Sequence, residues 1–386
     1  AAQKEAVTAA PEGLEEAWSL AGPWVGVATD SKRARTYVVS RNGQCAEVDA
    51  SGKRLREFRI DDTPSAVRTA NLAGDDSPEL ITFTNWGRTV KAHDLKGATL
   101  WTYAVGQGVD DVWAADLNED GLDEIIIGYN GATGLHALEN RGTVLWQYTQ
   151  IGNVWHVCAG EVNGDGHPEV VTTSAQGKVH VFDAKGSKLK DLSPGCYGNM
   201  VRVARVSDKE FAVIAGGSGD AGVQLVRLDF GGTTKWSVDL PTASVDHIDS
   251  ACAARSAPLL AVGMRGGLVH VVDVTQGKLL GHVGGLGQSP EVGWLELGKK
   301  ETPLLLVATG GDLKAFRLKG DGVGGTIAAF ALDSGGSPGR RNGAVLAAVS
   351  ALLLAGLAAG YWVRRRRSPG ESVREDSSEG AVPSPG

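Results

Sequence analysis

The strongest constraint in this sequence is a short turn signal that returns at an almost constant interval. An acidic or polar residue follows an alternating apolar segment, and glycine comes three or four places later. Successive glycines of this signal are 45, 45, 44, 46, 45 and 43 residues apart. A fixed period of this size is typical of repeat proteins, so we infer seven copies of one unit. The glycines are Gly52, Gly97, Gly142, Gly186, Gly232, Gly277 and Gly320.

Each copy carries signals for four short strands in the same order. A first strand leads into a polar loop, and a strongly apolar second strand follows, as at 125–127. A glycine hairpin, such as Asn42-Gly43 or Trp86-Gly87, then reverses the chain, because glycine adopts positive φ easily. The third strand alternates in polarity, and the fourth carries Trp101, Trp146 or Trp236 in three of the copies. Four antiparallel strands in about 45 residues form one propeller blade.

The sequence therefore predicts an all-β, seven-bladed β-propeller with four-stranded blades over residues 14–332, after an N-terminal extension over 1–13. The blades are expected to start near residues 23, 65, 109, 153, 197, 243 and 288. The last blade lacks a tryptophan-bearing fourth strand, whereas residues 14–20 resemble an isolated one. We expect residues 14–20 to close the last blade, with residues 326–332 as the competing candidate, because a closed ring leaves few open sheet edges.

One polar loop has the ligand spacing of a calcium site. Residues 116–124 read DLNEDGLDE, with oxygen-bearing side chains at the first, third, fifth and ninth places and Gly121 at the sixth. Ca²⁺ takes six to eight oxygen ligands, and EF-hand loops also need a glycine at the sixth place. The predicted ligands are Asp116, Asn118, Asp120, Glu124 and the carbonyl of Leu122.

A second loop repeats the pattern one blade later, starting 45 residues after Asp116. Its predicted ligands are Glu161, Asn163, Asp165, His167 and Glu169. The alternative is that both loops are ordinary surface turns, since Asp, Asn and Gly dominate turns without any metal. In another blade, residues 71–79 keep the frame of the loop but lose the third ligand and the glycine.

The strand order also predicts a ligand-binding face. Loops that join the fourth strand of one blade to the first of the next lie with the glycine hairpins on one face, opposite the polar loops. Aromatic and ionisable side chains that converge at a concave mouth are typical of a binding site. The alternative is that Trp155 packs between blades while neighbouring carbonyls satisfy His156 and His247. The predicted binding residues are Trp86, Asp110, Asp111, Trp155, His156, Tyr197, Asp246 and His247.

The C-terminal segment has the composition of a membrane anchor. Residues 344–363 contain no charged residue and are long enough to cross about 30 Å of hydrocarbon as a helix. Arg364–Arg367 follow at once, which places the C-terminal side in the cytoplasm. We expect a linker over 333–343, a single transmembrane helix over 344–363 and a cytoplasmic tail over 364–386; a buried soluble helix is the alternative.

The expected location of the propeller is extracytoplasmic, either periplasmic or extracellular. The sequence begins with Ala1 rather than methionine, as expected after removal of a signal peptide. The net charge of −7, with no evident basic face, argues against a nucleic-acid partner. No serine-nucleophile, zinc-protease or phosphate-loop motif is present, so we expect neither an enzyme nor a small-molecule cofactor. The pairing of Cys45, Cys158, Cys196 and Cys252 stays open.

The loop over residues 116–124 resembles the FG-GAP or VCBS repeat of the seven-bladed propeller at the head of integrin α chains. Residues 90–101 and 179–186 also resemble the repeats of quinone-dependent dehydrogenases and of outer-membrane assembly scaffolds. The resemblance covers about residues 14–320 and implies a calcium-binding propeller. We expect a protein- or glycan-binding adhesion or assembly scaffold on the outer side of a membrane. The alternatives are a lyase-like propeller enzyme acting on polysaccharide and a quinoprotein-like dehydrogenase.

Overall fold

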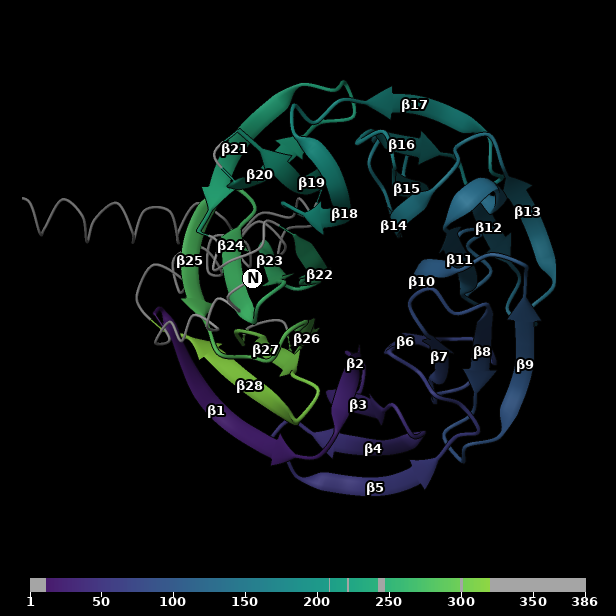
Figure 1. The fold of residues 1–386 in the computed structure, drawn as a ribbon, viewed down its shortest axis with the longest axis vertical. Helices are drawn as coiled ribbons and strands as arrows, with labels where there is room; N and C mark the ends of the chain where they lie inside the picture. The colour runs from purple at the N-terminus through teal and green to yellow at the C-terminus, as the bar shows by residue number, and fades with distance from the viewer. Residues whose placement is uncertain (1–11, 208, 221, 242–246, 299–300, 320–386) are drawn as a thin grey trace, which may run out of the picture. The chain divides into compact units, whose positions relative to one another are not determined.

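The protein folds into a ring of seven antiparallel sheets, each with four strands (Figure 1). The structure is a computed structural model that describes residues 12–207, 209–220, 222–241, 247–298 and 301–319. The first strand of each sheet lies nearest the centre of the ring and the fourth lies on its outside (Figure 1). The predicted all-β, seven-bladed propeller with four-stranded blades is therefore confirmed.

Blades 1 to 6 each use four consecutive strands, and they begin close to the predicted starts. Their bounds are β2 (Trp24–Asp30), β3 (Arg35–Ser40), β4 (Gln44–Asp49) and β5 (Arg54–Arg59) in blade 1; β6 (Ala66–Ala70), β7 (Glu79–Phe83), β8 (Thr89–His93) and β9 (Thr99–Ala104) in blade 2; β10 (Val109–Ala115), β11 (Glu124–Tyr129), β12 (Leu135–Leu138) and β13 (Val144–Tyr148) in blade 3; β14 (Val154–Gly160), β15 (Glu169–Ser174), β16 (Val179–Phe182) and β17 (Lys188–Leu192) in blade 4; β18 (Tyr197–Arg205), β19 (Phe211–Gly219), β20 (Gly222–Leu228) and β21 (Thr234–Leu240) in blade 5; and β22 (Ile248–Ala253), β23 (Leu259–Met264), β24 (Leu268–Asp273) and β25 (Lys278–Val283) in blade 6.

Blade 7 joins the two ends of the propeller. It consists of β26 (Glu291–Leu295), β27 (Leu304–Ala308) and β28 (Asp312–Leu318), together with the N-terminal strand β1 (Leu14–Ala21). Strand β1 pairs with β28 in an antiparallel register that runs from Leu14 opposite Leu318 to Ala21 opposite Asp312. Residues 14–20 thus occupy the fourth-strand position, whereas residues 326–332 lie outside the described part of the chain.

The burial of each strand depends on its place in the blade. Second and third strands lie between neighbouring sheets, and β11, β23 and β24 are buried at every position. Fourth strands such as β9 alternate between exposed and half-buried residues. Continuous apolar runs therefore form the second strands and alternating segments form the outer edge, whereas third strands such as β24 are buried although they contain polar residues such as His270.

The repeated tryptophan and the repeated glycine meet across the blade boundaries. Trp101 donates its indole N–H to the carbonyl of Asn140 at 2.9 Å, and its ring lies against Gly142 of the next blade. A Cβ atom at Gly142 would come within 2.8 Å of that ring, and the glycine has φ +79°. The period in the sequence therefore follows from an interblade contact. The other pairs are Trp18 with Gly52, Trp146 with Gly186, and Trp236 with Gly277.

One hairpin departs from the sequence expectation. At Trp86-Gly87 the tryptophan, and not the glycine, has positive φ, at +65°. The backbone N–H of Trp86 donates to Val109, and the N–H of Val109 donates to Gly87, each at 2.7 Å. A non-glycine residue in this region costs about 1–3 kcal/mol, and such residues cluster at functional sites. The hairpin holds the indole of Trp86 outward, where it is 77% exposed.

Within the described ranges, no helix combines the length and the apolar character that crossing a membrane requires. The predicted linker, the predicted transmembrane helix over 344–363 and the predicted cytoplasmic tail all lie outside those ranges.

Candidate binding site

A cavity of about 310 Å³ lies at one end of the central channel. Its volume is at the lower end of the range for small-ligand sites. Tyr197 is not part of the lining, but its ring makes an edge contact with Trp155 at 5.6 Å, and Asp246 lies outside the described residues. The structure therefore brings six of the eight predicted binding residues into one cavity. These six are Trp86, Asp110, Asp111, Trp155, His156 and His247.

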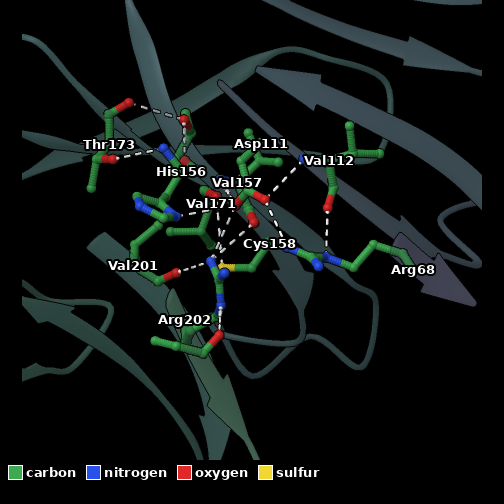
Figure 2. Close-up of polar contacts among 12 residues, drawn as sticks. Arg68, Asp111, Val112, His156, Val157, Cys158, Val171, Thr173, Val201 and Arg202 are labelled. Atoms are coloured by element: carbon green, nitrogen blue, oxygen red, sulfur yellow. Dashed lines mark hydrogen bonds and ion pairs between the residues drawn. The ribbon is translucent and has the colours of Figure 1, made fainter. Parts of the chain in front are cut away.

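Asp111 is the centre of an ion-pair network in the wall of this cavity (Figure 2). Its Oδ1 atom lies 3.1 Å from Nη2 of Arg68, and its Oδ2 atom lies 3.4 Å from Nη1 of Arg202. The Nδ1 atom of His156 lies 3.2 Å from the same Oδ2 atom. Arg68 also pairs with Glu291 at 2.9 Å. Because Asp111 is only 3% exposed, these charges compensate one another inside the protein rather than through water.

The neighbouring cations control the ionisation of Asp111. Burial by itself raises the pKa of this carboxyl group, but Arg202, the hydrogen bond from His156 and Arg68 outweigh the burial. The pKa of Asp111 is therefore held well below its ordinary value. Arg202 is almost fully buried and also donates to the carbonyl of Ala251 at 2.7 Å, so with Glu291 the network joins blades 2 to 7.

Arg68, Arg202 and Glu291 separate the two ends of the channel. They line the first cavity and also a second cavity of about 830 Å³, which includes Asp116 and Gly121 of the first polar loop. The binding residues and this loop thus lie at opposite ends, as the strand order predicts. The three separating residues were missed in the sequence. Because the first strands that carry Arg68 and Arg202 also contain other polar residues, no local pattern distinguishes these two arginines.

Asp110 differs from its neighbour in having no cation beside it among the described residues. Burial raises its pKa to about 7, the negative charge of Asp111 adds to the rise, and a hydrogen bond from Asn130 opposes it. Its Oδ2 atom is buried and has no hydrogen-bond partner in the described part of the chain. A buried acceptor without a partner costs about 1–3 kcal/mol, which a ligand that donates a hydrogen bond would recover.

Asn199 provides a second acceptor of the same kind. Its side chain is 6% exposed, and its Oδ1 atom has no partner among the described residues. Its Nδ2 atom lies 3.0 Å from Nδ1 of His247. Since Nδ2 can only donate, Nδ1 of His247 accepts and the other ring nitrogen carries the proton. Among the described residues, the ring of His156 contacts Asp111 and the ring of His247 contacts Asn199.

The first predicted calcium loop is held in shape by its own side chains. The amide of Asp120 donates to Oδ1 of Asp116 at 3.1 Å and to Oδ1 of Asn118 at 2.9 Å. The amide of Gly121, at φ +90°, donates to Oδ2 of Asp116, and the amide of Leu122 donates to Asp120. The oxygens of Asp116 and Asn118 therefore converge on the amide of Asp120.

The second loop has the same form. Glu161 accepts from the amides of Asn163 and Gly166, and the amide of Asp165 donates to Asn163. The His167 ring lies 3.0 Å from the carboxylate of Glu119 and so connects the two loops. No group of three or more His, Cys, Asp or Glu side chains is arranged as a metal site within the described ranges. Calcium binding stays a prediction.

The ninth-place glutamates have a structural role that the sequence did not reveal. Glu124 accepts from the amide of Leu117 at 2.8 Å, and Glu169 accepts from the amide of Val162 at 2.9 Å. Glu79 makes the equivalent contact in blade 2, whose loop lacks the full ligand pattern. Because the contact forms in all three blades, it stabilises the loop with or without the remaining ligands.

Blade 4 contains a chain of hydrogen bonds that resembles a catalytic triad. The ring of His180 contacts the hydroxyl of Ser174 at 2.9 Å and the carboxylate of Asp191 at 2.6 Å. Ser174 is fully buried, so a substrate cannot reach its hydroxyl. His93 contacts Thr82 in the same way in blade 2. The chain of contacts therefore fastens strands within a blade.

The ring and its cavity define a seven-bladed β-propeller with a ligand-sized site at one channel mouth. A family model described as the lambda-carrageenase beta-propeller domain matches residues 80–159. The matched segment contains Trp86, Asp110, Asp111, Trp155 and His156. No curated protein matches the chain significantly.

Solved structures with the same fold include two crystal structures of BBS1N in complex with ARL6DN, one soaked with lead and one with mercury. The matched chain of the first is 14% identical with a TM-score of 0.56, and the alignment covers 83% of this chain and 99% of that one. The second is also 14% identical with a TM-score of 0.56, and covers 81% and 97%. At this identity the likeness shows the fold alone.

Proposed function

We propose that this protein is a membrane-anchored binding propeller that captures a surface glycan or a partner protein at the 310 Å³ cavity. Residues 344–363 would anchor it, with the propeller on the extracytoplasmic side. The proposal rests on one observation: residues from six blades converge on a cavity whose lining includes two buried acceptor oxygens without partners among the described residues. Acceptors of this kind favour a ligand that donates hydrogen bonds.

A glycan agrees with this cavity better than a partner protein does. The exposed indole of Trp86 and the contacting rings of Trp155 and Tyr197 offer flat aromatic surfaces near the opening. The apolar face of a sugar ring packs on such a surface, while its hydroxyl groups donate to acceptors. The family whose model matches residues 80–159 is named for an enzyme of lambda-carrageenan, which also favours a saccharide.

We expect Trp86→Gly and Trp155→Ala to weaken glycan capture, because each removes an aromatic surface from the cavity. Glycine also suits the positive φ of position 86, so the first variant preserves the hairpin. A glycan array probed with the full chain, followed by titration of each hit, measures the effect. Leu145→Ala on the outer edge of blade 3 is the control and retains capture. Equal binding by all three variants would remove this cavity as the site.

Calcium binding at the two polar loops is a further part of the proposal. Its support is the convergence of Asp116 and Asn118 oxygens in the first loop and the related form of the second. The cation would stiffen the turns between first and second strands of blades 3 and 4.

We expect calcium to raise the free energy of unfolding of EDTA-treated protein by about 2.7 kcal/mol for each occupied loop at about a hundredfold excess over Kd. The expected response is smaller in Asp116→Asn, which keeps the loop length but removes a charged ligand. Asp75→Asn, in the loop that lacks the full pattern, responds like the wild type. Thermal and urea unfolding with and without calcium measure the gain, and no gain in the wild type contradicts a calcium site.

A polysaccharide-processing enzyme is the second candidate. The carrageenase-type family match favours it, as does Asp110, whose pKa of about 7 suits a general acid or base at neutral pH. Incubation of the full chain with neutral and anionic polysaccharides, followed by detection of new reducing ends or unsaturated products, separates an enzyme from a binding protein.

A further inference from the structure

The carboxylates that line the cavity outnumber the arginines that line it. Three arginines and four carboxylates belong to the lining. Arg68 and Arg202 are compensated by Asp111 and Glu291. Arg265 pairs with Asp249 at 2.7 Å. The remaining carboxylate is Asp110, so an ionised Asp110 leaves one negative charge without a cation in the described part of the site.

The same cavity also contains a neutral acceptor. Asn199 is almost fully buried, lines the same cavity, and has its Oδ1 atom without a partner among the described residues. Because its Nδ2 atom is already engaged with His247, the amide is held with Oδ1 free to accept. A hydroxyl donor would satisfy either oxygen but would leave the charge. A ligand that carries both a cation and further hydrogen-bond donors would compensate the charge of Asp110 and provide donors for its Oδ2 atom and for Oδ1 of Asn199.

We propose that the cavity binds a saccharide with a free, protonated amino group, whose ammonium pairs with Asp110 while a further donor of the sugar reaches Asn199 and its ring packs against Trp86. This inference rests on the proposed function and specifies its ligand. A saccharide is favoured over a lysine side chain because the indole of Trp86 is 77% exposed and presents a flat surface. A sulfated or carboxylated sugar is disfavoured, because its charge would meet that of Asp110.

Asp110→Asn is a suitable test because it removes the charge and keeps the shape of the side chain. The raised pKa of Asp110 means that its ionised form destabilises the fold as pH rises from about 4 towards 7, so its removal does not threaten folding. Asp61→Asn is the matched control, since Asp61 is exposed and does not belong to the cavity lining.

The experiment titrates the full chain with glucosamine oligomers and with N-acetylglucosamine oligomers of equal length, in a buffer at about pH 7, where the carboxyl group of Asp110 is partly ionised. We expect the amine form to bind about tenfold more tightly or better, as a charge-assisted hydrogen bond implies. Asp110→Asn removes this preference and Asp61→Asn retains it. Trp86→Gly weakens both oligomers.

The outcomes separate this inference from the proposed function. Equal binding of the two oligomers, or a preference that survives in Asp110→Asn, overturns the amine assignment while glycan capture stands. Binding of an oligolysine peptide but of neither oligomer overturns the saccharide assignment. If neither the wild type nor Trp86→Gly binds any saccharide, the proposed glycan function fails as well.

Discussion

Replacement of Asp111 with alanine is expected to lower the free energy of unfolding by about 3–5 kcal/mol, which is the usual effect of removing one partner of a buried ion pair. The variant leaves Arg202, which is 2% exposed, without a carboxylate at ion-pair distance among the described residues, and leaves Arg68 with Glu291 as its remaining carboxylate partner there. Urea unfolding of residues 1–335, the compact unit that contains the propeller, measures the loss. A loss below about 1 kcal/mol would contradict the structural role of the network.

Two comparisons make the result specific to the network. Asp61→Ala removes an exposed aspartate of the same size and is expected to change stability by less than about 0.5 kcal/mol. The second comparison is pH. Because the folded pKa of Asp111 is depressed, its stabilisation is present above the unfolded value of about 3.9 and is lost as pH falls through the folded value. The difference between wild type and Asp111→Asn should therefore shrink below about pH 4.

The repeat and the strand order were predictable because their signals are local. The turn glycines, the glycine hairpins and the alternating third and fourth strands each need only a few neighbouring residues. The contact that explains the period, such as Trp101 on Gly142, joins adjacent blades and becomes visible only in the fold. At position 86 the local rule failed, because backbone hydrogen bonds with Val109 and Gly87 hold a tryptophan in a conformation that normally suits glycine.

The binding site was predictable only in part. Trp86, Asp110 and His156 follow turns whose face is fixed by the strand order. Arg68 and Arg202 lie inside first strands, and the partner that compensates both of them, Asp111, is 43 and 91 residues away along the chain. No local sequence pattern indicates an ion-pair partner so far away along the chain. The sequence of the polar loops predicts the shape of the turn. It does not show whether Glu124 is a calcium ligand or accepts a hydrogen bond from the backbone of its own loop, as it does here from Leu117.

Removal of residues 1–22 is expected to abolish the stable monomeric ring. The truncation deletes β1, whose register with β28 covers residues 14 to 21, and it removes the fully buried Leu14 from the core of blade 7. It also removes Trp18, which packs on Gly52 and donates to the carbonyl of Ala50 at 3.0 Å. Strand β28 would then present an unpaired edge, which favours aggregation. Size-exclusion chromatography and urea unfolding measure both effects.

The matched control is a truncation of residues 1–10, which keeps β1 and should unfold like the wild type. Deletion of 326–332, the competing closing segment, should likewise preserve the ring, because β1 already occupies the fourth-strand position of blade 7. A peptide of residues 12–22, added to the truncated chain, should restore part of its solubility, since it can pair with the free edge of β28. A monomeric 1–22 truncation with an unchanged urea midpoint would show that the ring closes without its N-terminal strand.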